Sequence, residues 1–176
     1  MAEKTVTVFG SGGIQEGSQQ WRQAYEVGSF LAKAGFVVVT GGYGGAMTAS
    51  AQGAKDAGGT TIGVTTNEFS GSVKNEFIDR EIRMPTWRER LHELVRLGDG
   101  FVVLDGGTGT LAEFMVVWEM ENKHLHAKPI AVLGCQMQSF ISALKQNPEV
   151  RIPKALYLVS TPEAARDYLK ASLPNA

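Results

Sequence analysis

The fold is decided by one stretch of the chain, FVVLDGGTGTLAE at residues 101–113. The stretch begins with a continuous apolar run, passes through three glycines and ends in residues that favour a helix. A run that is apolar at every position is typical of a parallel strand, because helices cover both faces of a parallel sheet. The stretch therefore predicts a buried parallel strand, a tight glycine-rich turn and a helix that starts at the carboxyl end of the strand.

The same pattern recurs along the chain. Strand-like runs occupy residues 5–9, 36–40, 61–65, 101–104, 129–133 and 156–159, with a weaker candidate at 77–83. Helical patterns occupy residues 19–34, 46–57, 87–97, 111–122, 137–146 and 162–171. This alternation predicts an α/β fold: a single Rossmann-like three-layer αβα domain over residues 1–176, with a mostly parallel sheet of six or seven strands.

Several residues mark the expected helix ends. Thr86 with Glu89, and Thr110 with Glu113, have the spacing of a capping box. Thr161 followed by Pro162 fits an N-cap with proline in the first turn, and Gly35 and Gly58 fit helix C-termini.

Composition excludes several classes of protein. Lys and Arg number 17 against 18 Asp and Glu, so no basic excess is available to bind a nucleic acid polymer. The single cysteine, Cys135, rules out a multi-cysteine metal site, and His124-Leu125-His126 is interpreted as an exposed turn, so we expect no metal and no cofactor. The apolar runs are short and the N-terminal residues are not those of a signal peptide, so we expect a cytoplasmic protein that makes no contact with a membrane.

Many of the 21 glycines lie in three clusters, and each cluster follows a predicted strand. The clusters are Gly10, Gly12 and Gly13; Gly41, Gly42, Gly44 and Gly45; and Gly106, Gly107 and Gly109. Ligands of an open parallel sheet bind at the carboxyl ends of its strands, where free helix N–H groups attract anions. The clusters thus favour a nucleotide or phosphate ligand over the alternative of tight turn packing alone.

Three familiar nucleotide or hydrolase classes do not fit these loops. The third loop matches a dinucleotide fingerprint, but the next strand ends Leu133-Gly134-Cys135 and lacks the acidic residue that binds the ribose. No Gly-Lys-Ser/Thr sequence is present for a P-loop, and no Gly-x-Ser-x-Gly sequence is present for a serine hydrolase.

The segment GGTGTLAE at 106–113 resembles the Pro-Gly-Gly-x-Gly-Thr-x-x-Glu motif of the LONELY GUY (LOG) family, whose members are often labelled lysine-decarboxylase-like. VFGSG at 8–12, GGYGGAM at 41–47 and IGV at 62–64 extend the resemblance over most of the chain. The resemblance implies a phosphoribohydrolase that cleaves the N-glycosidic bond of a nucleoside 5′-monophosphate (AMP or a cytokinin ribotide) to the free base and ribose 5-phosphate, and that forms a homodimer. A related branch implies the alternative, a non-catalytic carrier that binds a nucleotide or the molybdenum cofactor.

The resemblance also implies the site residues. Glu113 and Arg90 match the family's catalytic Glu and Arg, with the same number of residues between them. The implied nucleotide and phosphate site comprises Gly10, Ser11, Gly12, Gly42, Gly44, Gly45, Met47, Gly106, Gly107, Thr108, Gly109 and Thr110. The chain departs from the family pattern at Asp105, which replaces Pro, at Trp87-Arg88, which replaces Met-His, and at Leu91, which replaces Lys.

Local patterns leave some of these roles open. Helical periodicity places Arg88 and Arg90 at the two borders of one apolar stripe, so periodicity does not choose between them. Glu113 fits both a catalytic role and a capping box with Thr110. Asp105 fits both a turn at the end of a strand and a contact with the ribose.

The predicted helix 111–122 is apolar on nearly every side. A helix that packs one face on a sheet normally carries polar residues on the opposite face. We therefore expect a second copy of the chain to cover its outer side, the alternative being cover by neighbouring helices of the same chain.

Overall fold

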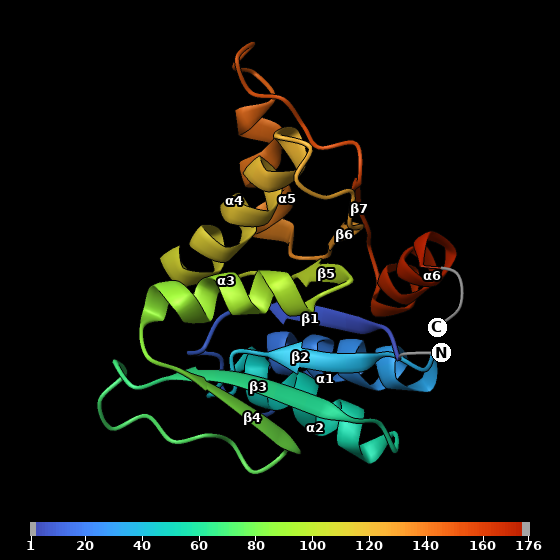
Figure 1. The fold of residues 1–176 in the computed structure, drawn as a ribbon. Helices are drawn as coiled ribbons and strands as arrows, with labels where there is room; N and C mark the ends of the chain where they lie inside the picture. The colour runs from blue at the N-terminus through green and yellow to red at the C-terminus, as the bar shows by residue number, and fades with distance from the viewer. Residues whose placement is uncertain (1–2, 174–176) are drawn as a thin grey trace.

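A computed structural model describes residues 3–173 and contains a seven-stranded sheet (Figure 1). Its strands are β1 (Thr5–Phe9), β2 (Val37–Thr40), β3 (Thr61–Thr66), β4 (Arg80–Met84), β5 (Gly100–Val103), β6 (Ile130–Val132) and β7 (Leu156–Leu158). They lie in the order β4-β3-β2-β1-β5-β6-β7, and every pair is parallel. The predicted Rossmann-like α/β fold is confirmed, and the weak strand candidate at 77–83 corresponds to β4 at the edge of the sheet.

Six helices form the two outer layers. They are α1 (Gln19–Lys33), α2 (Ala46–Asp56), α3 (Trp87–Leu97), α4 (Thr108–Asn122), α5 (Cys135–Leu144) and α6 (Pro162–Ser172). In Figure 1, α3 crosses in front of the sheet, and α1 and α2 lie behind it. Successive strand residues point to opposite faces of the sheet. Val6 and Val8 pack with α1 and α2 on one face, whereas Phe9 and Val39 pack with α3, α4 and α5 on the other.

Most helix ends follow the sequence signals. Thr86 and Glu89 form the predicted capping box, and Thr161 caps α6 with Pro162 in its first turn. Gly35 and Gly58 follow α1 and α2 with φ angles of 88° and 79°, a conformation that glycine adopts without strain.

The predicted capping box of Thr110 and Glu113 is wrong. The helix α4 starts at Thr108 rather than 111, so both residues lie inside it, and its N-cap is Gly107, which has no side chain to bond. The α5 helix likewise starts at Cys135 rather than 137. At α4, the capping-box motif was outweighed by the way the preceding strand ends and turns.

The turn after β1 lies between those after β2 and β5. Ser11 donates its backbone N–H to Asp105 O at 3.1 Å, and Ser11 O accepts from Ala46 N at 2.8 Å. Strand connections run in opposite directions on the two sides of β1, and such a switch point opens a crevice at the carboxyl edge of the sheet. The three glycine clusters therefore meet at one crevice.

Close packing of α1 on α2 depends on glycine. A Cβ added at Gly28 would lie 1.9 Å from Ser50 O, and one added at Gly53 would lie 2.0 Å from Tyr25 O. We expect Gly28→Ala and Gly53→Ala each to lower the free energy of unfolding by about 1–3 kcal/mol, because the two helices must move apart. Thermal and urea unfolding measure this effect. Gly109→Ala is the control, since this helical glycine has no atom within 4 Å of an added Cβ, and equal losses in all three variants would contradict the packing argument.

Candidate active site

Arg90 points from α3 to the carboxyl edge of the sheet and is only 4% exposed. Its Nε donates to Val64 O at 2.8 Å, and its Nη2 donates to Gly41 O at 3.1 Å. Arg88, on the other border of the apolar stripe, is exposed. The fold thus makes the choice that periodicity left open, because Arg90 faces the crevice and Arg88 faces solvent.

Glu113 lies on α4 opposite Arg90. Its Oε1 is 3.6 Å from Arg90 Nη1, and its side chain is 15% exposed. Burial raises the pKa of Glu113 to about 7, while the Arg90 charge acts in the opposite direction. Burial also lowers the pKa of Arg90, although the Glu113 carboxylate favours its charged form. A carboxyl group that titrates near neutral pH suits proton transfer.

A cavity of about 340 Å³ opens above this pair. Eight residues of the implied nucleotide site line the cavity together with Arg90 and Glu113: Gly10, Ser11, Gly12, Met47, Gly107, Thr108, Gly109 and Thr110. The structure therefore gathers residues from the first, second and third glycine-rich loops around one space.

The other four implied residues shape the turns behind the cavity. A Cβ at Gly45 would lie 2.4 Å from Ser11 O, and one at Gly106 would lie 2.1 Å from the Thr110 hydroxyl. Gly42 has a φ of 77° and donates its N–H to Thr40 Oγ1, and Gly44 packs against Gly12 O. These glycines allow the three glycine-rich loops to approach one another closely. The backbones of the loops therefore lie at the edge of the cavity.

The N-terminus of α4 faces the cavity. Thr108, Gly109 and Thr110 form its first turn, and the N–H groups of a first turn have no partner inside the helix. The Gly107 cap adds no side-chain bond that would occupy them. Free N–H groups at the positive end of a helix dipole form a site for a phosphate or another anion.

Three aromatic side chains form the wall that sequence reasoning did not predict. Tyr43, Phe69 and Trp87 line the cavity, and Arg90 Cζ lies 5.5 Å from the ring centroids of both Tyr43 and Phe69. The Tyr43 hydroxyl donates to Thr66 O at 3.2 Å and accepts from Thr66 N at 2.9 Å. Tyr43 lies within a glycine cluster, which was a usable signal, whereas Phe69 lies in an irregular loop without any periodicity.

Asp105 has a role other than contact with the ligand. Its Oδ1 accepts from the backbone N–H groups of Gln136 and Met137 at 2.8 and 3.1 Å, and its Oδ2 accepts from Cys135 Sγ at 3.3 Å. Asp105 therefore caps α5 and turns away from the cavity. This contact explains why α5 starts two residues earlier than the sequence predicts, and it answers the open question in favour of the turn.

The His124-Leu125-His126 segment forms the turn after α4. His124 is exposed with a φ of 59°, and His126 Nδ1 accepts from Lys128 N at 3.2 Å. Within residues 3–173, no three His, Cys, Asp or Glu side chains are grouped as metal ligands. Within the same range, no helix has the length and apolar character needed to cross a membrane.

Comparison with known proteins places this chain in a family. The model of the SLOG cluster4 family matches residues 3–165. A cytokinin riboside 5′-monophosphate phosphoribohydrolase from Mycobacterium tuberculosis is 30% identical over 162 residues, covering 86% of this chain and 84% of that protein. The one from Rhodococcoides fascians is 31% identical over 134 residues, covering 74% of this chain and 68% of that protein.

A solved structure links the chain to the related branch of proteins that bind the molybdenum cofactor. The molybdenum cofactor binding protein of Rippkaea orientalis is similar to this chain with a TM-score of 0.77 and 26% identity, covering 98% of both chains. The chain therefore belongs to the SLOG cluster4 family and to the LOG family, to which this molybdenum cofactor binding protein is structurally similar.

Proposed function

We propose that the protein hydrolyses the N-glycosidic bond of a nucleoside 5′-monophosphate, such as AMP or a cytokinin ribotide, to the free base and ribose 5-phosphate. The observation that carries this proposal is the buried pair of Arg90 and Glu113 at the floor of a cavity that the N-terminus of α4 borders. The named activity of the mycobacterial and Rhodococcoides relatives supports the same reaction.

The cavity has room for one nucleotide. Its volume of about 340 Å³ lies at the small end of the range for ligand pockets, about 300–1,000 Å³, which favours a mononucleotide over a dinucleotide. In the proposed complex, the N–H groups of the first turn of α4 and the Ser11 hydroxyl bind the 5′-phosphate. The ribose then lies over Glu113.

Glu113 is the catalytic residue of the proposed reaction. Cleavage of the C1′–N bond leaves the bonding electrons on the base and positive charge on the ribose, which an ionised carboxylate stabilises. Glu113 then takes a proton from the water whose oxygen bonds to C1′, and a proton from solvent neutralises the departing base. Arg90 orients the carboxylate, because the Val64 and Gly41 carbonyl oxygens fix its guanidinium group.

The alternative is a carrier that holds a nucleotide or the molybdenum cofactor without reaction. Its support is the likeness to the Rippkaea protein, and the same anion site would bind the phosphate of either ligand. A carrier would bind AMP tightly without releasing adenine, and Glu113→Ala would leave that binding unchanged. Adenine release by the wild-type protein, measured by chromatography, distinguishes the two functions.

Replacement of Glu113 tests its catalytic role. Glu113→Gln keeps the size of the side chain and removes its basic oxygen, so we expect AMP binding to persist and turnover to fall about 10²–10⁴-fold. Calorimetry measures binding, and chromatography measures adenine release. Glu119→Gln is the matched control on the same helix, because Glu119 is exposed and pairs with Lys123 at the surface. Turnover by Glu113→Gln at the wild-type rate would contradict the mechanism.

The raised pKa of Glu113 predicts a pH profile. Burial raises this pKa to about 7, and the carboxylate must be ionised to take a proton from water. We therefore expect kcat/KM for AMP to rise tenfold per pH unit below about pH 7 and to level off above it. The residual activity of Glu113→Gln should lack this inflection. A wild-type profile that stays flat between pH 5.5 and 8.5 would remove Glu113 from the role of base.

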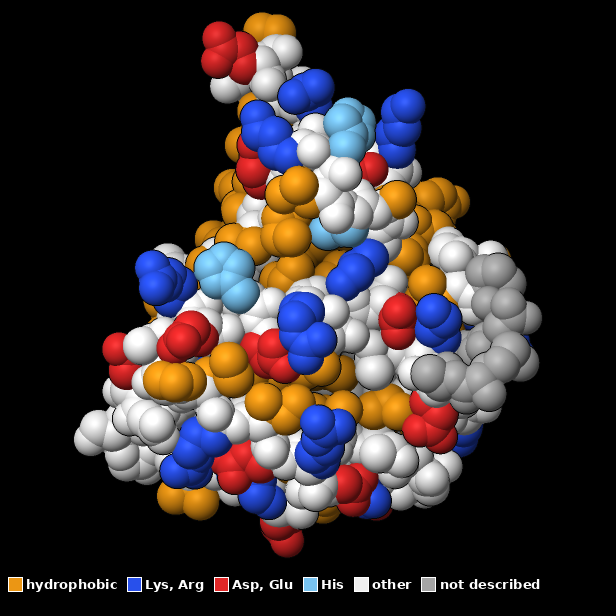
Figure 2. Space-filling model, in the orientation of Figure 1, with side chains coloured by type: hydrophobic (Ala, Val, Ile, Leu, Met, Phe, Trp, Pro, Cys, Tyr) orange, Lys and Arg blue, Asp and Glu red, His pale blue; other side chains and the backbone are white. Residues whose placement is uncertain are grey.

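We also propose that the protein forms a homodimer through α3 and α4. On α4, Leu111, Met115, Val116 and Met120 are only partly buried, and Leu125 beyond it is 68% exposed. Figure 2 shows hydrophobic side chains gathered between α3 and the projecting part of the molecule that contains α4. Met120 and Leu125 line a hollow of about 660 Å³ whose rim carries both Arg and Glu side chains. A rim with both charges complements itself across a two-fold axis, which favours a second copy as the occupant.

An acidic residue in this surface should prevent association. We expect the wild-type protein to sediment near twice 19.0 kDa at micromolar concentration, and Leu125→Asp to sediment near 19.0 kDa. The burial of an unpaired carboxylate in the interface explains the loss. Val73→Asp is the control, because Val73 is 81% exposed in the loop between β3 and β4. A wild-type species near 19.0 kDa would refute the dimer.

A further inference from the structure

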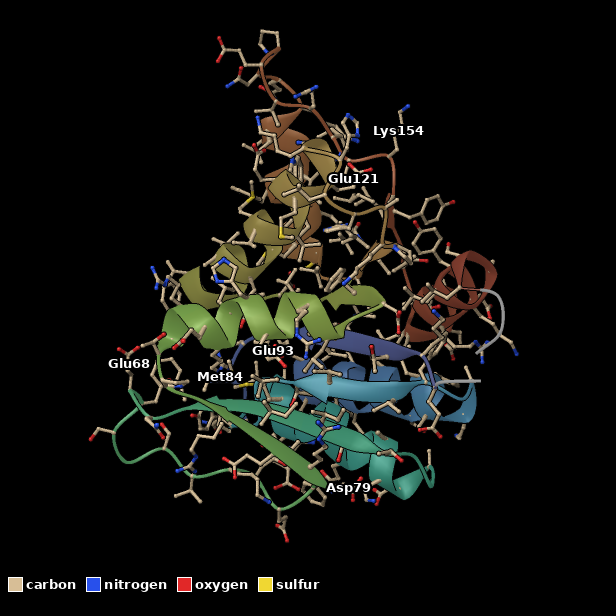
Figure 3. The ribbon with its side chains drawn as sticks, viewed as in Figure 1. Glu68, Asp79, Met84, Glu93, Glu121 and Lys154 are labelled. Carbon is tan, nitrogen blue, oxygen red and sulfur yellow. The ribbon has the colours of Figure 1, made fainter. Side chains whose placement is uncertain are left out.

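The loop between β3 and β4 is held against α3 by one carboxylate. Glu68 Oε2 accepts the backbone N–H of Trp87, the first residue of α3. In Figure 3, the Glu68 side chain lies beside the first turn of this helix. The loop begins to turn just before this contact, where Asn67 N donates to Met84 O at 3.1 Å. The next residue after Glu68 is Phe69, so this contact holds the Phe69 backbone close to α3.

The far part of the same loop is fixed to the second glycine cluster. Asn75 donates its backbone N–H to Gly42 O at 2.9 Å and its side-chain Nδ2 to Tyr43 O at 2.8 Å. Both attachments are to elements that border the cavity. The loop therefore spans one side of the cavity between two anchors, with Phe69 next to the first of them.

Phe69 and Trp87 offer large aromatic surfaces to the cavity. They line it while remaining 37% and 42% exposed. Tyr43 supports Phe69 from behind, with 5.7 Å between the two ring centroids and an angle of 49° between the rings. Aromatic rings bury large apolar areas and stack on flat π-systems, so exposed rings at a ligand cavity suit a planar ligand group.

The order of the strands determines which end of a nucleotide meets these rings. The proposed phosphate site lies after β5 and β1, whereas Tyr43, Phe69 and Trp87 follow β2, β3 and β4. β1 and β5 lie at the switch point, and β2, β3 and β4 lie on one side of it, successively farther from β5. A nucleotide with its phosphate at α4 and its ribose at Glu113 therefore extends its base towards the aromatic rings.

We propose that Phe69 and Trp87 clasp the base of the substrate, and that Glu68 is the positioning residue that holds these two rings together. This inference rests on the proposed function and adds to it the residues that bind and position the base. The Glu68 carboxylate is held at α3 through its Oε2 atom, which accepts the Trp87 N–H. Stacking on Phe69 and Trp87 tolerates different aromatic bases, because every base has a π-face.

Binding measurements separate the base from the rest of the ligand. The experiment uses Glu113→Gln as the background, so that AMP is not consumed, and calorimetry compares AMP with ribose 5-phosphate. We expect Phe69→Ala to weaken AMP binding about 10- to 100-fold, the range for the loss of one aromatic stacking partner, and to leave ribose 5-phosphate binding unchanged. GMP should bind within a few-fold of AMP.

Variants of Glu68 test the positioning role. Glu68→Ala should weaken AMP binding several-fold without any effect on ribose 5-phosphate, whereas Glu68→Gln should restore binding, because its amide oxygen still accepts the Trp87 N–H. Glu76→Ala, an exposed acidic residue of the same loop, is the matched control and should bind AMP normally. Equal weakening by Glu68→Ala and Glu76→Ala would reject the Glu68 contact as the cause.

The outcomes distinguish this inference from the proposed function. If the wild-type protein releases adenine, and Phe69→Ala and Glu68→Ala leave its KM for AMP unchanged, the aromatic clasp is rejected. The proposed hydrolysis is then unaffected. Protein that binds no AMP and releases no adenine would overturn both.

Discussion

The burial of one guanidinium group constrains the whole carboxyl edge of this sheet. A buried charge is very unfavourable unless it is paired and hydrogen-bonded, so Arg90 needs partners on every side. The fold supplies Val64 O, Gly41 O and the Glu113 carboxylate. A Cβ at position 41 would lie 1.9 Å from Arg90 Nη2, so a larger residue there would displace the guanidinium group from its hydrogen bonds. Gly41 therefore accommodates Arg90 and also lines the cavity.

The same constraint determines how Glu113 behaves. Its 3.6 Å separation from Arg90 Nη1 is too long for a hydrogen bond, so the arginine stabilises the carboxylate only through charge. Loss of solvent outweighs that attraction and raises the pKa of Glu113 to about 7. A shorter contact between Arg90 and Glu113 would lower the pKa of Glu113, so that its carboxylate would be ionised but a weaker base. The two carbonyl oxygens that hold the guanidinium group therefore also preserve the basicity of Glu113.

Sequence patterns predicted the features that depend on local or periodic interactions. Continuous apolar runs predicted the strands, and the Thr86–Glu89 spacing predicted the start of α3. The errors occurred where a distant contact decides the outcome. Asp105 caps α5 from the end of β5, and the loop that carries Phe69 is attached to α3 by the contact of Glu68 with Trp87 N–H, nineteen residues along the chain. Periodicity did not separate Arg90 from Arg88, and only the fold shows that Arg90 is buried at the crevice while Arg88 is exposed.

Energetics bear on the choice between hydrolysis and storage in this cavity. A carrier needs the anion site and a surface for the rest of its ligand, and the N-terminus of α4 with the aromatic wall supplies both. In a carrier, Glu113 would serve only to pair with the buried charge of Arg90, and its loss would leave that charge uncompensated. A hydrolase needs a base at this place. A pKa of about 7, which pairing with Arg90 alone does not require, therefore supports the proposed hydrolysis.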